Sequence, residues 1–108
     1  MKLLLTLFCA FALFPVFGQN ISGLLRDEKG NALEYVAVTL YQAADSTLVK
    51  GEVTDDQGAF LFNDVSPGSY YLECSFIGFD NYKSEAIQIS NGKNVDLATI
   101  TLHPTSQM

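Results

Sequence analysis

The chain has 108 residues, which leaves room for one domain, and its composition is acidic. Twelve Asp and Glu residues outweigh six Lys and Arg residues, so the formal net charge is −6 at pH 7. Proteins that bind nucleic acid or anionic lipid need positive charge on the contacting surface. We therefore expect no nucleic-acid partner and no binding to anionic membranes.

The start of the chain has the pattern of a secretory leader. Lys2 precedes an apolar run, Pro15 breaks that run, and the small Gly18 lies directly before Gln19. A cationic start, a short apolar core and a small-residue exit are typical of a cleavable signal peptide. The run is shorter than the ~20 apolar residues that a transmembrane anchor needs. We expect residues 1–18 to be removed during export.

Cleavage at that point would leave one cysteine, Cys74, because Cys9 lies in the leader. An intramolecular disulfide is then impossible, although an exporting compartment would permit one. Cys74 shares its alternation with Leu72 and Phe76, so we expect it to be a small buried hydrophobic residue.

The mature part alternates short apolar runs with turn residues. The runs recur at roughly the 8–12-residue spacing of a sandwich or barrel, and no stretch keeps the 3.6-residue period of a long helix. The sequence therefore predicts an all-β domain. Its seven predicted strands lie at about residues 21–27, 35–41, 48–54, 59–62, 69–76, 83–89 and 94–102.

Seven short strands with one apolar face each predict two sheets packed face to face in an antiparallel β-sandwich. In the third strand, the alternation predicts that Val49, Gly51 and Val53 point into the core. In the last strand the inward parity shifts, which predicts a bulge near Ala98-Thr99.

Residues that could carry catalysis or bind a metal are few. His103, the single histidine, lies beyond the last strand, where no third group would orient it as a catalytic base. One histidine and one cysteine cannot fill a zinc site. We predict no catalytic, cofactor-binding or metal-binding residue and no enzyme activity. Several carboxylates fall in turns, where Asp bonds its own backbone and a weak Ca²⁺ site is the alternative; they are Asp45, Asp55, Asp56 and Asp64.

Aromatic side chains suggest a binding surface. Tyr41, Tyr71, Phe79 and Tyr82 are predicted outside the core or at a bend, together with Tyr35. Exposed aromatic rings can stack on sugars or anchor a protein partner, and a free edge strand can pair with another chain. The alternative interpretation is that sheet surfaces favour tyrosine without any binding role.

Short motifs follow one another along nearly the whole mature chain. They are Ile21-x-Gly23-x-Leu25-x-Asp27, Gly30-Asn31-Ala32-Leu33, Val36-Ala37-Val38-Thr39-Leu40, Asp45-Ser46-Thr47-Leu48-Val49-Lys50-Gly51, Thr54-Asp55-x-x-Gly58-x-Phe60, Val65-x-x-Gly68-x-Tyr70-x-Leu72, Ser75-x-Ile77-Gly78-Phe79 and Ile100-x-Leu102. In this order and spacing they resemble the carboxypeptidase regulatory-like domain, a transthyretin-like (prealbumin-like) Greek-key sandwich. More closely, they resemble the version that opens TonB-dependent outer-membrane receptors of Bacteroidetes-like bacteria.

The resemblance implies a domain over residues 19–102, a polar tail over 103–108, and a location in the periplasm or at the periplasmic face of the outer membrane. It implies a non-catalytic accessory module whose partner is an envelope protein, such as a receptor plug or barrel. We expect no plug or barrel in this chain, because the sequence given ends at Met108. The alternative is a freestanding exported carbohydrate-binding-like sandwich, with a glycan as its ligand. The matched motif residues are structural, so the resemblance assigns no functional residue.

Overall fold

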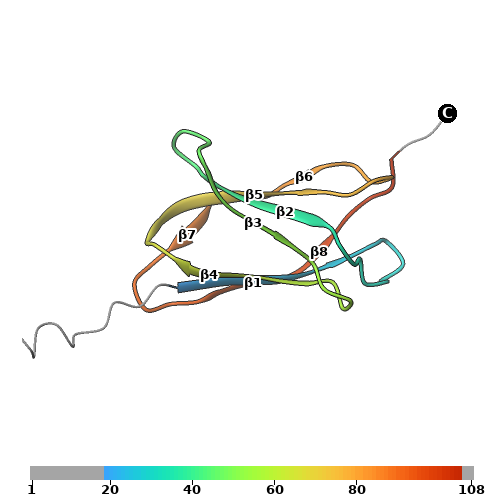
Figure 1. Ribbon diagram of the computed structural model, residues 1–108, viewed down its shortest axis with the longest axis horizontal. Coiled ribbons are helices and arrows are strands. Elements are labelled where there is room, and N and C mark those ends of the chain that lie inside the picture. The colour runs from blue at the N-terminus through green and yellow to red at the C-terminus, as the bar shows by residue number, and fades with distance from the viewer. Residues whose placement is uncertain (1–18, 106–108) are drawn as a thin grey trace, which may run out of the picture.

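The computed structural model describes residues 19–105, which form two facing β-sheets (Figure 1). The expected signal peptide, residues 1–18, and the last three residues of the expected tail lie outside the described residues. Residues 19–105 contain strands and turns but no helix, and therefore no helical segment that could cross a membrane. The predicted two-sheet β-sandwich is confirmed.

The first sheet has three strands in the order β4-β1-β8: β1 spans Gln19–Arg26, β4 spans Ala59–Val65 and β8 spans Val95–Thr101. β1 pairs antiparallel with β4 but parallel with β8. The parallel pair corrects the all-antiparallel prediction. It is possible because most of the domain lies between β1 and β8 in the chain, which leaves room for the crossover that parallel strands require.

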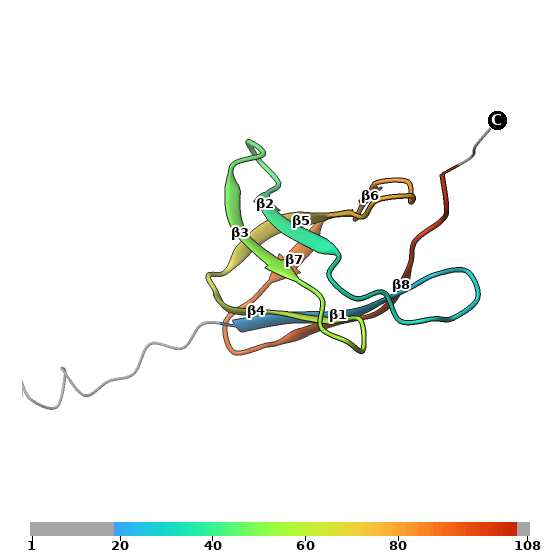
Figure 2. The same cartoon turned by 45° about the vertical axis from the view of Figure 1, so that its right-hand side comes forward.

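The second sheet has the order β3-β2-β5-β6, and β7 pairs with β5 off this path (Figure 2). Its strands are β2 (Ala37–Gln42), β3 (Leu48–Val53), β5 (Gly68–Ser75), β6 (Tyr82–Lys83) and β7 (Ile87–Ile89).

Eight strands replace the seven predicted, because the strand predicted at residues 83–89 is two short strands. Ser84 lies at the break between them. Its hydroxyl accepts a hydrogen bond from the Leu72 N–H at 2.9 Å, while its N–H donates to the Leu72 carbonyl at 2.8 Å. A side-chain oxygen thus replaces one bond of the strand ladder, and the strand is interrupted there.

The core lies between the two sheets and is built by strand alternation. Ile21 and Leu25 enter it from β1, Val38 and Leu40 from β2, and Leu72 from β5. Cys74 is buried beside them, as predicted. Each fully buried aliphatic side chain contributes roughly 1.5–3 kcal/mol relative to exposure.

β3 does not bury the residues that its alternation predicts. Val53 is 58% exposed and Gly51 is also exposed, while Val49 is partly buried against the core. The reason is the pairing of β3 with β2. Val53 lies opposite Ala37 and Gly51 opposite Thr39, and directly opposed residues share one face of a sheet. That face is the outer one, so the prediction for Gly51 and Val53 was wrong.

The predicted bulge in the last strand is confirmed. Between Ser22 and Leu24 of β1, the partner in β8 moves from Asp96 to Thr99, so β8 carries one extra residue. Ala98 takes a φ of 59°, and its N–H donates to the Asp96 carboxylate at 2.9 Å. The side-chain bond holds the left-handed backbone that the bulge requires.

The turn between β3 and β4 depends on Gly58. Its φ is 78°, and its carbonyl accepts a hydrogen bond from the Leu25 N–H at 2.7 Å. A Cβ at this position would lie 2.4 Å from the Leu25 carbonyl oxygen. The turn can therefore approach β1 only because the residue has no side chain.

We expect Gly58→Ala to lower the free energy of unfolding more than Gly92→Ala does. Both glycines have a positive φ, so both variants carry the left-handed cost of an L residue, roughly 1–2 kcal/mol. Nothing lies within 4 Å of a Cβ at Gly92. Only Gly58→Ala adds a collision with backbone, worth roughly 1–3 kcal/mol more. Urea unfolding measures both, and equal losses would contradict the expectation.

Candidate interaction surface

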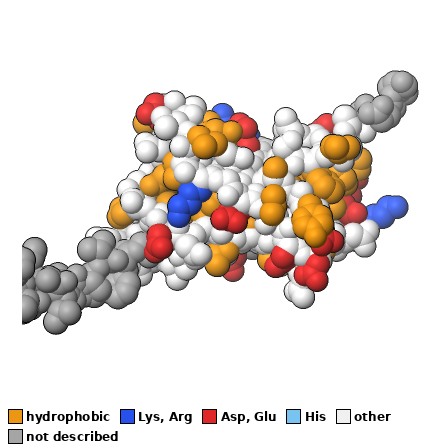
Figure 3. Space-filling model, in the orientation of Figure 1, with side chains coloured by type: hydrophobic (Ala, Val, Ile, Leu, Met, Phe, Trp, Pro, Cys, Tyr) orange, Lys and Arg blue, Asp and Glu red, His pale blue; other side chains and the backbone are white. Residues whose placement is uncertain are grey.

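Three large apolar side chains are exposed at one end of the second sheet, and we call them the apolar end: Tyr35 (71% exposed), Val53 (58%) and Ile77 (95%). The pairing of β2 with β3 and β5 places all three at the same end of the sheet. Ala37 lies opposite both Val53 and Ser75, while Tyr35 precedes Ala37 by two residues and Ile77 follows Ser75 by two. Figure 3 shows hydrophobic side chains gathered on the right-hand part of the face that it presents.

Tyr35 is held in place by Thr54, which is almost fully buried. The Thr54 hydroxyl donates to the Leu33 carbonyl at 2.6 Å and accepts from the Val36 N–H at 2.9 Å. The Thr54 carbonyl accepts from the Tyr35 N–H at 3.0 Å. Tyr35 has a φ of 64°, a conformation that costs a bulky residue roughly 1–3 kcal/mol. These bonds compensate for that cost and keep the exposed ring at the end of β2.

Tyr41 and Tyr71 form a second aromatic feature on the outer face of the same sheet. Their rings stack with centroids 5.2 Å apart and planes 19° apart. The Lys83 ammonium lies 4.5 Å from the Tyr71 centroid. Tyr41 comes from β2 and Lys83 from β6, on opposite sides of β5, so the Tyr71 ring lies between them. A sugar could stack on Tyr71 only after displacing one of these neighbours.

The other two aromatic residues predicted for this surface lie elsewhere. Tyr82 pairs with Cys74, whose side chain is buried, so the tyrosine faces the core side of the sheet. Partial burial raises the pKa of the Tyr82 phenol above its usual value. Phe79 is partly buried and packs against Phe76 at a centroid distance of 5.6 Å. The four residues therefore do not form one continuous surface.

Two members of the apolar end, Val53 and Ile77, were missing from the predicted surface. The alternation of β3 shows which residues share a face with Val53, but it does not show which face of the sheet is covered. Ile77 lies between β5 and the Gly78 turn, which has a φ of 89°. In the sequence, the sign that Ile77 would be exposed is its position directly before a turn glycine.

Two of the four carboxylates predicted in turns, Asp45 and Asp55, bind backbone as predicted. Asp55 accepts hydrogen bonds from the N–H groups of Ala59 and Gln57, both at 2.9 Å, and these bonds hold its pKa below the usual value. Asp45 accepts from the Thr47 N–H at 3.0 Å. Within residues 19–105, no group of three or more His, Cys, Asp or Glu side chains is arranged to hold a metal ion.

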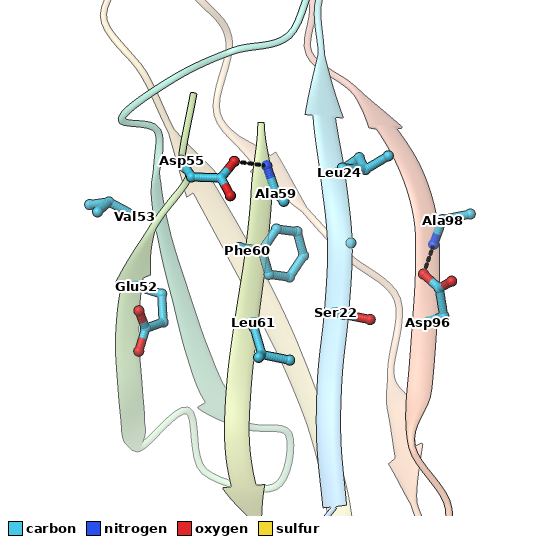
Figure 4. A pocket seen from close by; sticks show the side chains of 11 residues that line it. Ser22, Leu24, Glu52, Val53, Asp55, Ala59, Phe60, Leu61, Asp96 and Ala98 are labelled. Atoms are coloured by element: carbon cyan, nitrogen blue, oxygen red, sulfur yellow. Dashed lines mark hydrogen bonds between the residues drawn. The ribbon is translucent and has the colours of Figure 1, made fainter. Parts of the chain in front are cut away.

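A hollow of about 640 Å³ crosses β3, β4, β1 and β8 (Figure 4). Figure 4 shows Glu52 and Asp55 on one side of it and Asp96 on the other. Asp55 and Asp96 each bind backbone N–H groups of their own turn or bulge. His103 lies on the surface, with its Nδ1 2.6 Å from Glu28 Oε2. The hollow therefore does not place the histidine beside any of its three carboxylates.

The two facing sheets and the strand order define a β-sandwich module of the transthyretin-like kind. The chain belongs to the carboxypeptidase regulatory-like domain family, whose model matches residues 20–103. The family resemblance drawn from the sequence motifs is thus confirmed. Members of this family are generally non-catalytic β-sandwich domains.

Solved structures share the fold at low sequence identity. The Bacillus anthracis TIE protein matches with a TM-score of 0.68 and 19% identity over 82% of this chain and 17% of its own. The group B streptococcus pilus 2b backbone protein matches with a TM-score of 0.63 and 15% identity, over 81% of this chain and 41% of its own. Klebsiella pneumoniae 5-hydroxyisourate hydrolase matches with a TM-score of 0.61 and 20% identity, over 82% of this chain and 90% of its own.

At these identities the likeness shows the fold alone. The chain spans less than half the length of the first two of these structures, so it corresponds to one module within them. No curated protein sequence matches the chain.

We expect Thr54→Val to lower the free energy of unfolding by about 2–4 kcal/mol, because it leaves the Val36 N–H and the Leu33 carbonyl buried without a partner. Thr54→Ser keeps the hydroxyl and should lose only about 1 kcal/mol for the missing methyl group. Chemical denaturation compares the two variants. A larger loss for serine than for valine would mean that packing, not hydrogen bonding, makes this residue important.

We expect the Cys74 thiol to resist alkylation in the folded protein. It is buried, and burial raises its pKa to about 12. The folded state therefore keeps a proton that the unfolded state loses, so this residue's contribution to stability is lost as pH rises from about 9 towards about 12. Iodoacetamide labelling at pH 8, with and without urea, checks the burial. Equal labelling rates in the two conditions would contradict it.

Proposed function

We propose that this chain is a non-catalytic, exported interaction module of the cell envelope, and that its partner is a protein. The partner class we propose is an outer-membrane receptor plug or barrel, or another component of the outer membrane. Three observations support the proposal: the family of the domain, the leader-like first 18 residues, and the apolar end.

The apolar end carries the proposal. Tyr35, Val53 and Ile77 are each more than half exposed. Exposed apolar side chains that gather in one place mark interaction sites, and a tyrosine at the centre of such a patch is a common anchor. In addition, Tyr35 keeps its exposed position at the cost of a left-handed backbone. A strained, exposed aromatic residue that is held by buried hydrogen bonds favours a role in binding.

The envelope setting comes from the sequence. The first 18 residues have the pattern of an export signal, and the motif order resembles the domain that opens TonB-dependent receptors. A domain in that position would act through contacts with its neighbours.

The proposal is tested by photocrosslinking in the native cell. A benzoylphenylalanine placed at Tyr35 should give a discrete adduct with one envelope protein. The same probe at Leu61 is the matched control, because Leu61 is a hydrophobic residue 45% exposed on the other sheet. Tyr35→Ala together with Ile77→Ala should weaken capture of that protein at least tenfold, which is the size of effect that anchor residues produce.

Adducts of equal yield from Tyr35 and Leu61, or none from Tyr35, would refute the proposal. Capture that is unchanged by the double alanine variant would place the contact elsewhere on the domain. Leu61→Ala should leave capture unchanged. Thermal unfolding of each variant shows whether that variant remains folded.

A further inference from the structure

Among the strands of residues 19–105, β3 pairs only with β2 and is therefore a free edge of the second sheet. The Thr54 N–H donates to the Val36 carbonyl at 3.1 Å, so the main-chain groups of Thr54 point towards β2. Main-chain groups alternate in direction along an antiparallel strand. Those of Gly51 and Val53 therefore point away from β2, towards the free edge. A second strand could form hydrogen bonds with them.

Two unlike charges flank Gly51 on this edge. Lys50 lies opposite Leu40 and Glu52 opposite Val38, so both charged side chains lie on the core-facing side of the sheet. Because β3 is an edge strand, these side chains lie at the margin of the core: Lys50 is partly buried and Glu52 is exposed. Inward charges on an edge strand discourage indiscriminate pairing, and they also select a strand of complementary charge.

We propose that β3 pairs antiparallel with β3 of a second copy of this chain, about a two-fold axis at Gly51. In this register Lys50 of each copy lies opposite Glu52 of the other, so two unlike pairs form at once. Gly51 lies opposite Gly51, so neither copy places a side chain at the axis. The main-chain groups that meet there are the ones that point away from β2.

Other two-fold registers fit less well. An axis at Lys50 places two ammonium groups opposite each other, and an axis at Glu52 places two carboxylates opposite each other. An axis at Val53 places Glu52 opposite Thr54. Neither Lys50 nor Glu52 then lies opposite a residue of the other charge in β3. Among axes within the strand from Lys50 to Val53, the one at Gly51 alone matches both the charges and the direction of the main-chain groups.

The charge pattern also explains why the partner strand is a second copy. A strand that complements β3 in this register must carry an acidic and a basic residue two positions apart, in the opposite order when it runs antiparallel. β3 itself meets this requirement, since an interface with two-fold symmetry uses the same patch on both subunits. The dimer would join the two second sheets into one continuous sheet and would leave Tyr35 and Ile77, which lie outside β3, available to another protein.

Sedimentation equilibrium of the full chain tests the dimer over about a hundredfold range of concentration. The unmodified chain should shift from monomer to dimer within that range. Lys50→Glu alone and Glu52→Lys alone should each weaken association about tenfold or more, because each places like charges opposite each other. The exchange of both residues should restore it, because unlike charges again lie opposite each other.

The double exchange separates the proposed pairing from a structural role of Lys50. The Lys50 ammonium donates to the Asn63 carbonyl of β4, and both variants that replace it lose this contact. Restored association in the double exchange can therefore come only from the intersubunit pairs. Gly51→Pro is a second variant, which should abolish association and still fold, because its N–H points to the free edge.

Monomers at every concentration would overturn the proposal. So would a dimer that both single charge variants leave unchanged, because its interface would lie elsewhere. A double exchange that fails to restore association, while thermal unfolding shows it to be folded, would also overturn the register. Each result is independent of the crosslinking experiment, which probes Tyr35.

Discussion

The buried hydroxyl of Thr54 joins the end of β3 to the loop that leads into β2. It donates to the Leu33 carbonyl and accepts from the Val36 N–H, so it satisfies two backbone groups that would otherwise be buried without partners. The main chain of Thr54 binds Tyr35 and Val36 at the same point. One residue thus fixes where β2 begins, how β3 aligns with it, and where the exposed Tyr35 ring lies.

The alignment of β3 with β2 has consequences for the whole second sheet. It puts Val53 on the outer face beside Ala37, where it contributes to the apolar end. It puts Lys50 and Glu52 on the opposite face, at the margin of the core. No other strand of residues 19–105 pairs with the outer edge of β3, so these residues lie at an open edge, where Lys50 reaches the Asn63 carbonyl of β4. The exposed apolar residues and the charged edge are therefore two results of one strand register.

The candidate surface could be predicted only in part from sequence. Tyr41 and Tyr71 do lie together on an outer face, as their alternation predicts. Tyr82 does not join them, because β6 pairs with β5 through Cys74 and turns that ring towards the core. Val53 was assigned to the wrong face, since alternation shows which residues share a face but not which face is covered. Ile77 lies beyond the strand end, where alternation no longer applies.

Four features could be predicted from the sequence alone: the fold class, the family, the buried alternation of β1, β2 and β5, and the bulge at Ala98. These depend on local patterns of apolar residues and turn glycines, which the chain carries whatever surrounds it. The tertiary structure decided the parallel pairing of β1 with β8, the division of one predicted strand into β6 and β7, and the position of β3 at a free edge. These depend on contacts between segments far apart in the chain. An edge strand and a central strand can share the same alternation, and only the presence or absence of a neighbour distinguishes them.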